Sequence, residues 1–263
     1  MRFKRGGCIG VRRDMAYGRE SLNAPGHYTR TAGITFNSNQ LKLIAIIAMV
    51  FDHCMTVFVP HEFAAYQFLR MPGKLTAPIM CYLIAEGYYH TSNLKKYMLR
   101  LLVMAIISHF PFALCLEYDV FRFWEATDVL WSLLCGLIAL TVYHQNIPVI
   151  LKSALIGLCC LLAYSADWNY IAVLMVLFFG IFHEEKNKQT LAHIGISALY
   201  MLQAVYYASP ILSRVGILFS IPLLRRYNGQ RGRKSKLIQW GFYWFYPVHL
   251  LIIYFIKQLI ERG

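Results

Sequence analysis

The chain contains 263 residues, of which 58% are hydrophobic and 15% are charged, whereas soluble domains average about 45–50% apolar and about 25% charged residues. This composition excludes an ordinary soluble fold, an intrinsically disordered chain and a cysteine-dense disulfide scaffold. The formal net charge of +13 would indicate nucleic-acid binding in a soluble protein, but in a membrane protein basic residues first report orientation and contact with lipid head groups.

Long apolar windows with almost no charge recur along most of the sequence. A helix needs about 20 such residues to cross a bilayer. We therefore expect an all-α, polytopic integral membrane protein whose surroundings are the lipid bilayer, with no nucleic-acid partner. The seven cysteines show no CxxC spacing, and all but Cys8 lie in apolar segments, so we predict neither a disulfide framework nor a metal site.

The N-terminal segment, residues 1–39, is polar and basic and has no apolar core that could serve as a signal peptide or a span. We interpret it as a flexible cytoplasmic tail that precedes a transmembrane domain at residues 40–263. Met15 is an alternative start of the chain. The sequence does not indicate what this tail does. It also does not indicate the oligomeric state of the protein.

The apolar runs predict about nine transmembrane helices, and eight or ten remain compatible with the short lengths of some runs. The connections alternate in charge: those at 95–96, 186–188 and 225–236 are basic, whereas the stretch 117–128 is mainly acidic. The positive-inside rule then places the N-terminus in the cytoplasm. The predicted helices cover residues 40–59, 74–90, 97–116, 128–144, 147–165, 168–183, 191–207, 209–224 and 238–259.

The first of these helices carries three ionisable residues, Lys42, Asp52 and His53. His53 follows Lys42 by eleven positions, which places both on one helix face about 16 Å apart along the axis. Lysine at the membrane rim can bind a phosphate, and histidine is suited to remove a proton near neutral pH. The alternative is that Lys42 reaches lipid phosphates and that His53 forms a hydrogen bond with a neighbouring helix.

The second and third helices carry further polar candidates. Tyr82, Glu86 and His90 share one stripe of the second helix, where Glu86 could orient a base, contact a substrate amine or link two helices. His109 precedes Pro111, which leaves a backbone carbonyl without its donor and could shape a polar cavity. A simple helix kink would explain the same residues.

The last helix contains Tyr246, Pro247 and His249 in a run of aromatic residues. Pro247 predicts a kink and a free carbonyl beside Tyr246 and His249, and these could line a ligand cavity. A strongly basic loop precedes this helix. It could be an ordinary orienting loop, or it could bind a polyanion through arginines, namely Arg225, Arg226, Arg231 and Arg233.

In order along the chain, four segments resemble the TraX family of conjugation-encoded pilin acetylation proteins. The resemblance runs from about residue 39 to residue 258. The Lys-x10-His spacing of the first helix is also similar to a pattern in the acyltransferase-3 glycan O-acetyltransferases. The four segments are NQLKLIAIIAMVFDH at 39–53, GKLTAPIMCYLIAEGYYHT at 73–91, KKYMLRLLVMAIISHFPF at 95–112 and YNGQRGRKSKLIQWGFYWFYPVHL at 227–250.

This resemblance implies an acetyltransferase in a bacterial plasma membrane that uses cytoplasmic acetyl-CoA. It implies that His53 is the central catalytic residue, that Lys42 is an important basic position and that Asp52 is the acidic neighbour. We expect the phosphates of acetyl-CoA near Lys42 and the basic loop, with the thioester directed into the bundle. The acceptor, a peptide, a glycan or a small molecule, is not identified by the sequence.

The sequence leaves open the mechanism of His53 and two competing functions. His53 could act as a general base in direct transfer, or it could carry the acetyl group covalently. A transporter could use Glu86, His53, His109 and His249 as a proton relay. A noncatalytic assembly protein would not turn over acetyl-CoA.

Overall fold

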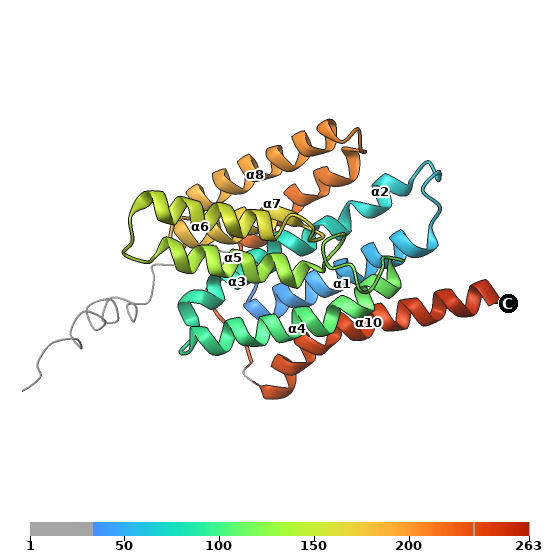
Figure 1. Ribbon diagram of the computed structural model, residues 1–263, viewed down its shortest axis with the longest axis horizontal. Coiled ribbons are helices and arrows are strands. Elements are labelled where there is room, and N and C mark those ends of the chain that lie inside the picture. The colour runs from blue at the N-terminus through green and yellow to red at the C-terminus, as the bar shows by residue number, and fades with distance from the viewer. Residues whose placement is uncertain (1–33, 234, 263) are drawn as a thin grey trace, which may run out of the picture. The chain divides into compact units, whose positions relative to one another are not determined.

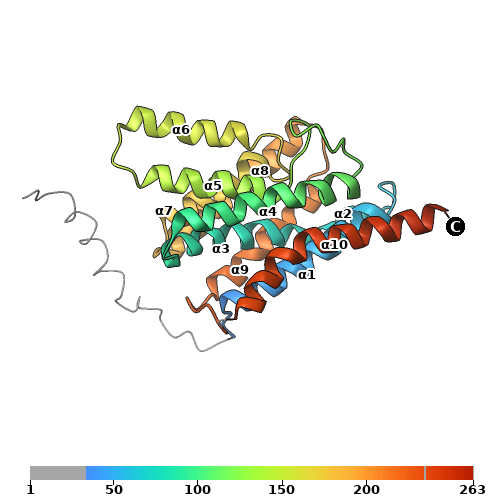
Figure 2. The same cartoon turned by 60° about the horizontal axis from the view of Figure 1, so that its bottom comes forward.

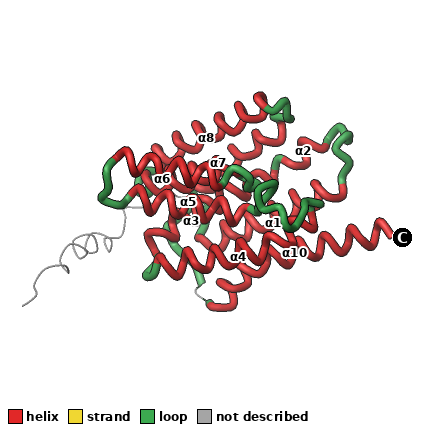
Figure 3. The backbone as a smooth tube through the Cα atoms, in the orientation of Figure 1, coloured by secondary structure: helices red, strands yellow, loops and turns green. Residues whose placement is uncertain are grey.

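A computed structural model describes residues 34–233 and 235–262, so the predictions for the tail at 1–33 lie outside the described residues. Helices dominate the described ranges, and no strand occurs in them (Figure 3). Two isolated bridges, Phe36 with Tyr227 and Thr127 with Ala166, are the β-type pairings within these ranges. The all-helical class predicted from the sequence is confirmed for this part of the chain.

Eight of the nine predicted helices form close to their expected positions, and a short helix and a 3-10 segment occur where no helix was expected. In chain order the elements are α1 (Ser38–Phe58), α2 (Tyr66–Arg70), η2 (Pro72–Leu75), α3 (Thr76–His90), α4 (Leu94–Cys115), α5 (Val129–Tyr143), α6 (Val149–Leu162), α7 (Asn169–Ile181), α8 (Lys186–Tyr206), η3 (Leu212–Phe219), α9 (Ser220–Arg225) and α10 (Lys236–Arg262).

Polar side chains fix where three of the long helices begin. Asn37 accepts a hydrogen bond from the backbone of Gln40, and the Gln40 side chain accepts one from the backbone of Asn37, which forms a capping box at α1. At α4 the Asn93 side chain accepts from the backbone N–H of Lys96, and at α5 the Asp128 side chain accepts from that of Trp131. These caps satisfy backbone N–H groups that would otherwise lack acceptors at the helix starts.

Helices α3, α5 and α7 form the centre of the described bundle. α7 packs against both α3 and α5, and most residues of these three helices are buried. Helix α6 lies on the outside of α5 and α7, and α4 lies along α10 (Figures 1 and 2). Helix α1 contacts α3 on one side and α10 on another, so it lies between the centre and the last helix.

Large apolar side chains also cover outward faces of the bundle. Ile150 of α6 is 86% exposed, Leu202 of α8 is 64% exposed and Leu259 of α10 is 73% exposed. Exposed apolar surface of this extent is unfavourable in water and favourable in a bilayer. Among the described residues, α1, α4 and Leu237–Arg262 of α10 are long and apolar enough to cross a membrane, and α5, α6 and α7 are shorter apolar helices.

The prediction of one continuous helix at 209–224 is wrong. The chain instead forms the 3-10 helix η3 and the short helix α9. Gly216 approaches η2 so closely that a Cβ there would lie 2.1 Å from the carbonyl oxygen of Met71. Pro222 also removes a backbone donor from this segment, so the tight contact between η2 and η3 replaces a regular helix.

The helix ends form two groups of connections. At one end, the segment before α1 bonds to the loop after α9, because Phe36 donates its N–H to the carbonyl of Arg226 and Ser38 donates to that of Gln230. Lys186 joins the same end by donating to the carbonyls of Arg225 and Tyr227. We call this the basic end. At the other end, Thr127 and Ser165 link the loops before α5 and α7.

Candidate functional site

Two histidines from distant helices meet in the interior. His53 of α1 and His249 of α10 are both buried, and Nδ1 of His53 lies 2.9 Å from Nε2 of His249. The Nδ1 atom of His249 lies 2.9 Å from the carbonyl oxygen of Phe245, one turn earlier in α10. The three groups therefore form a chain of hydrogen bonds that ends on a backbone carbonyl.

The carbonyl at the end of this chain fixes the proton positions of the neutral pair. A carbonyl only accepts, so Nδ1 of His249 carries a proton and its Nε2 is left as an acceptor. His53 must then donate from Nδ1 to His249, and the lone pair of neutral His53 resides on Nε2. No hydrogen bond to Nε2 of His53 occurs among the described residues. The geometry therefore presents Nε2 of His53 as a base.

A small, partly open cleft lies beside His53. Tyr246 of α10 lines it, and the ring centroid of Tyr246 is 6.4 Å from that of His53. Asp167 and Trp168, which precede α7, form another part of the wall. The cleft thus combines a histidine base, a phenol and a carboxylate from α1, α10 and the α6–α7 connection.

Asp52 lines the same cleft, but its carboxylate has other partners than His53. Arg70 of α2 donates to both carboxylate oxygens at 2.9 and 3.0 Å, and Lys74 of η2 donates to Oδ2 at 3.3 Å. Although burial alone would lower the pKa of Arg70, its hydrogen bond to Asp52 and the charge of that carboxylate raise the pKa above the usual range. Asp52 therefore ties α1 to the α2–η2 segment, and His249, not Asp52, orients the His53 ring.

Gly73 makes this contact between α1 and η2 possible. A Cβ at Gly73 would lie 2.2 Å from Cβ of Asp52 and 2.7 Å from its Oδ1. Because such distances are far shorter than van der Waals contact, only glycine fits against Asp52 here. The GKL sequence that opens the second TraX-like segment, at 73–91, therefore packs against the first TraX-like segment, at 39–53.

Lys42 lies on the same side of α1 as His53, as the spacing predicts, because both contact α10. The Nζ atom of Lys42 is 5.2 Å from the centre of the Phe242 ring. Arg231 is near enough to repel the Lys42 charge. Of the other basic candidates, Arg226 and Arg233 are exposed in the loop after α9, and the Arg233 carbonyl accepts from the Asn39 side chain.

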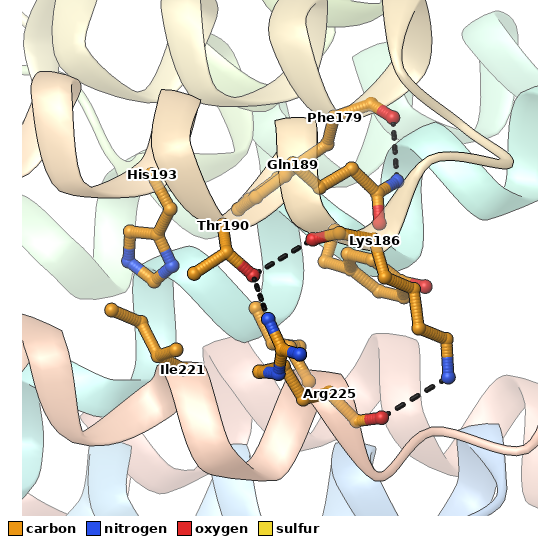
Figure 4. Close-up of a pocket in the computed structure, with 9 residues that line it drawn as sticks. Phe179, Lys186, Gln189, Thr190, His193, Ile221 and Arg225 are labelled. Carbon is orange, nitrogen blue, oxygen red and sulfur yellow. Dashed lines mark hydrogen bonds between the residues drawn. The ribbon is translucent and has the colours of Figure 1, made fainter.

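A second pocket opens at the basic end between α8 and α9 (Figure 4). Arg225 donates to the hydroxyl of Thr190 at 3.2 Å and to the side-chain oxygen of Asn187 at 3.3 Å. Lys186 and His193 also line the pocket. Arg225 is thus held toward α8, so the structure groups it with Lys186, whereas it groups Lys42 with Arg231.

The remaining two candidates from the sequence lie in other surroundings. The Nε2 atom of His109 is 3.0 Å from the carbonyl oxygen of Val120, and its ring stacks on Phe123. Glu86 is 2.9 Å from Nε2 of His183 and 3.3 Å from Nε2 of His90. The residues of the suggested proton relay therefore belong to three separate groups, and only the group of His53 and His249 contains two of them.

Sequence reasoning missed Arg70, Lys74, Asp167 and His183. Lys74 lies in GKLTAP, at the start of the TraX-like segment 73–91, and this position is the feature of the sequence that could have identified it. Arg70 and Asp167 lie between predicted helices and His183 is the last residue of one, and nothing in their spacing indicates which buried group each one meets.

Comparisons with known proteins identify the family of this chain. The model of the TraX protein family matches residues 37–257. A probable fimbrial assembly protein FimC, serogroup H1, from Dichelobacter nodosus is 31% identical over 241 residues, which cover 87% of this chain and 98% of that protein. No solved structure matches the chain significantly. The length of the family match and the extent of the similarity to this relative show that the chain belongs to the TraX family.

Proposed function

We propose that the protein is an integral-membrane acetyltransferase that moves an acetyl group from cytoplasmic acetyl-CoA to an amine or hydroxyl at or across the membrane. The observation that carries the proposal is the chain from His53 to His249 to the Phe245 carbonyl, which leaves Nε2 of His53 as a base beside a cleft. The TraX membership supports it.

In the proposed reaction, Nε2 of His53 takes a proton from the acceptor as its nitrogen or oxygen attacks the acetyl carbonyl. The imidazolium that forms is stabilised because His53 Nδ1–H already donates to His249. When the C–S bond breaks, His53 returns the proton to the departing thiolate of CoA. General acid–base catalysis of this kind contributes about 10²–10⁴-fold.

The donor substrate fits the basic end. The phosphates of acetyl-CoA are anionic, and Lys186 and Arg225 line a pocket there, with Lys42 and Arg231 nearby on the α1 side. Tyr82 of α3 lines this pocket, and Thr76 of the same helix lines the His53 cleft. Six residues of α3 correspond to about 9 Å of helix, a distance that an extended thioester arm can cover.

The proposed arrangement is a multi-pass protein of a bacterial plasma membrane with the basic end in the cytoplasm. The excess of lysine and arginine at that end supports this orientation. The cleft with His53, Asp167 and Trp168 would then open toward the external end. A relative described as a probable fimbrial assembly protein supports a peptide, and in particular a peptide N-terminus, as the acceptor that reaches His53 from outside.

The test uses the purified protein in detergent with acetyl-CoA labelled in the acetyl group, first alone and then with cell-envelope extract. Acetyltransferase function predicts a labelled product that appears only with active protein. Label that stays in acetyl-CoA under all conditions would contradict it. A reporter fused after Lys236 should read cytoplasmic, and one within 118–125 should read external.

A further inference from the structure

We propose that Glu86, His90 and His183 form a binding site for a divalent first-row transition-metal ion of the Zn²⁺ type. One carboxylate oxygen of Glu86 lies 2.9 Å from Nε2 of His183, and the other lies 3.3 Å from Nε2 of His90. One ligand atom from each of the three residues falls within 4.8 Å of the others. This spacing suits atoms that share one ion at about 2.0–2.2 Å.

The burial of these atoms and their unmet hydrogen-bonding capacity favour an ion over a network of hydrogen bonds. Both oxygens of Glu86 and Nε2 of His183 are buried, and none has a hydrogen-bond partner of acceptable geometry in the described ranges. Glu86 itself is 4% exposed. A buried carboxylate without an aligned donor is unfavourable, and a cation placed between the three atoms would satisfy all of them.

The surrounding structure holds the three side chains in place. His90 follows Glu86 by four positions on α3, so the two side chains lie on one face of that helix. His183 follows the end of α7, and the Tyr89 ring lies against it with ring centroids 4.0 Å apart. Tyr89 is anchored in turn, because its hydroxyl donates to the carbonyl of Gly180 at 2.7 Å.

The set of ligands indicates the class of metal. Two imidazoles and one carboxylate suit Zn²⁺ and its first-row neighbours, whereas Mg²⁺ and Ca²⁺ prefer oxygen ligands alone. The side chain of His90 is 62% exposed, against 5% for Glu86, so an ion can enter from the His90 side. Three protein ligands leave a position for water. The ion would join the end of α3 to the connection that leads into α8.

Co²⁺ is the probe for the test because it replaces Zn²⁺ and gives visible absorption that depends on coordination. The purified full-length protein is treated with a chelator, passed into metal-free buffer and titrated with CoCl₂. We expect one Co²⁺ per chain with the spectrum of a four- or five-coordinate site, displaced by ZnCl₂. His90→Ala should weaken Co²⁺ binding by more than about tenfold, since even an outer-shell partner of a ligand contributes that much.

His90 is the most exposed ligand, so His90→Ala should fold, and Glu86→Gln provides the second variant. The matched control is His144→Ala, because His144 lies 3.4 Å from the Tyr89 hydroxyl without being one of the three ligands. His144→Ala should bind Co²⁺ as the wild type does. Wild-type protein without stoichiometric Co²⁺, or equal affinity in wild type, His90→Ala and Glu86→Gln, would show that the cluster is an ion pair only and overturn the proposal.

Discussion

Two clusters of histidines, His53 with His249 and His90 with His183, have surroundings that give them different chemistry. In the His53 site, Nδ1 of His53 bonds to Nε2 of His249, and Nδ1 of His249 bonds to the carbonyl oxygen of Phe245. At Glu86 the imidazoles approach a buried carboxylate without aligned hydrogen bonds. Two hydrogen-bonded imidazoles fix each other's tautomer and leave one ring nitrogen as a base. Imidazole and carboxylate lone pairs that point toward one place can instead bind a metal ion.

The charges follow the same division. Near His53, the cations Arg70 and Lys74 already bind Asp52, so this region offers a base and a cleft with little free positive charge. At the basic end, the side chain of Arg225 reaches only neutral oxygen atoms among the described residues, and it keeps its full charge for an anion. The proposed function therefore requires proton transfer and phosphate binding in different regions, and the following predictions test this division.

The largest effect is expected from His53→Gln. Glutamine retains hydrogen bonding but cannot accept the acceptor's proton, so transfer should fall by about 10²–10⁴-fold. Acetyl-CoA binding should persist because Lys42, beside which we propose that the phosphates bind, lies about 16 Å from His53 along α1. The measurements are turnover of labelled acetyl-CoA and its equilibrium binding in detergent. His61→Gln, an exposed histidine after α1, is the control. Near-normal turnover in His53→Gln would return His53 to a structural role.

His249 should act as a positioning residue for His53. His249→Ala leaves the Nδ1–H of His53 without its acceptor, so the ring and its tautomer are no longer fixed. We expect turnover to fall by about 10–100-fold, as for other orienting partners, with little change in the KM for acetyl-CoA. His249→Asn supplies an acceptor oxygen and should recover part of the rate. Activity should fall as the pH is lowered, because protonation of Nε2 removes the base. Equal turnover in His249→Ala and His249→Asn would contradict the orienting role of His249.

Variants at the basic end should affect binding more than chemistry. A charge-assisted hydrogen bond contributes about 1.5–3 kcal/mol, so Arg225→Gln should raise the Kd for acetyl-CoA by about tenfold or more, and high salt should reduce the difference. Lys42→Ala should weaken binding, while Lys42→Arg should keep part of it because the charge remains. Calorimetric titration with acetyl-CoA checks both. A lower kcat at unchanged Kd would place these residues in the chemical step instead.

The sequence predicts eight of the nine expected helices well because apolar runs are local features. It also predicts that Lys42 and His53 share a face, since helix geometry fixes that relation. It cannot predict that His53 meets His249, because 196 residues separate them and the register of α1 against α10 depends on packing. The same holds for Glu86 with His183. The break at η3 escaped prediction because it depends on the approach of Met71 to Gly216, which neighbouring residues do not encode.

The smallest expected effect is structural and concerns Gly73. A methyl group in Gly73→Ala would collide with Asp52, and overpacking of this kind costs about 1–3 kcal/mol. Asp52 or η2 must then shift, which moves Arg70 and Lys74 as well. The free energy of unfolding should fall by that amount, with a moderate loss of turnover, because Asp52 directly precedes His53. Gly157→Ala is the control, since a Cβ at Gly157 meets no atom within 4 Å and alanine favours a helix by about 0.5–1 kcal/mol. If Gly73→Ala unfolds at the same denaturant concentration as Gly157→Ala, the contact between η2 and α1 is looser than the distances indicate, and Asp52 does not depend on it for its position.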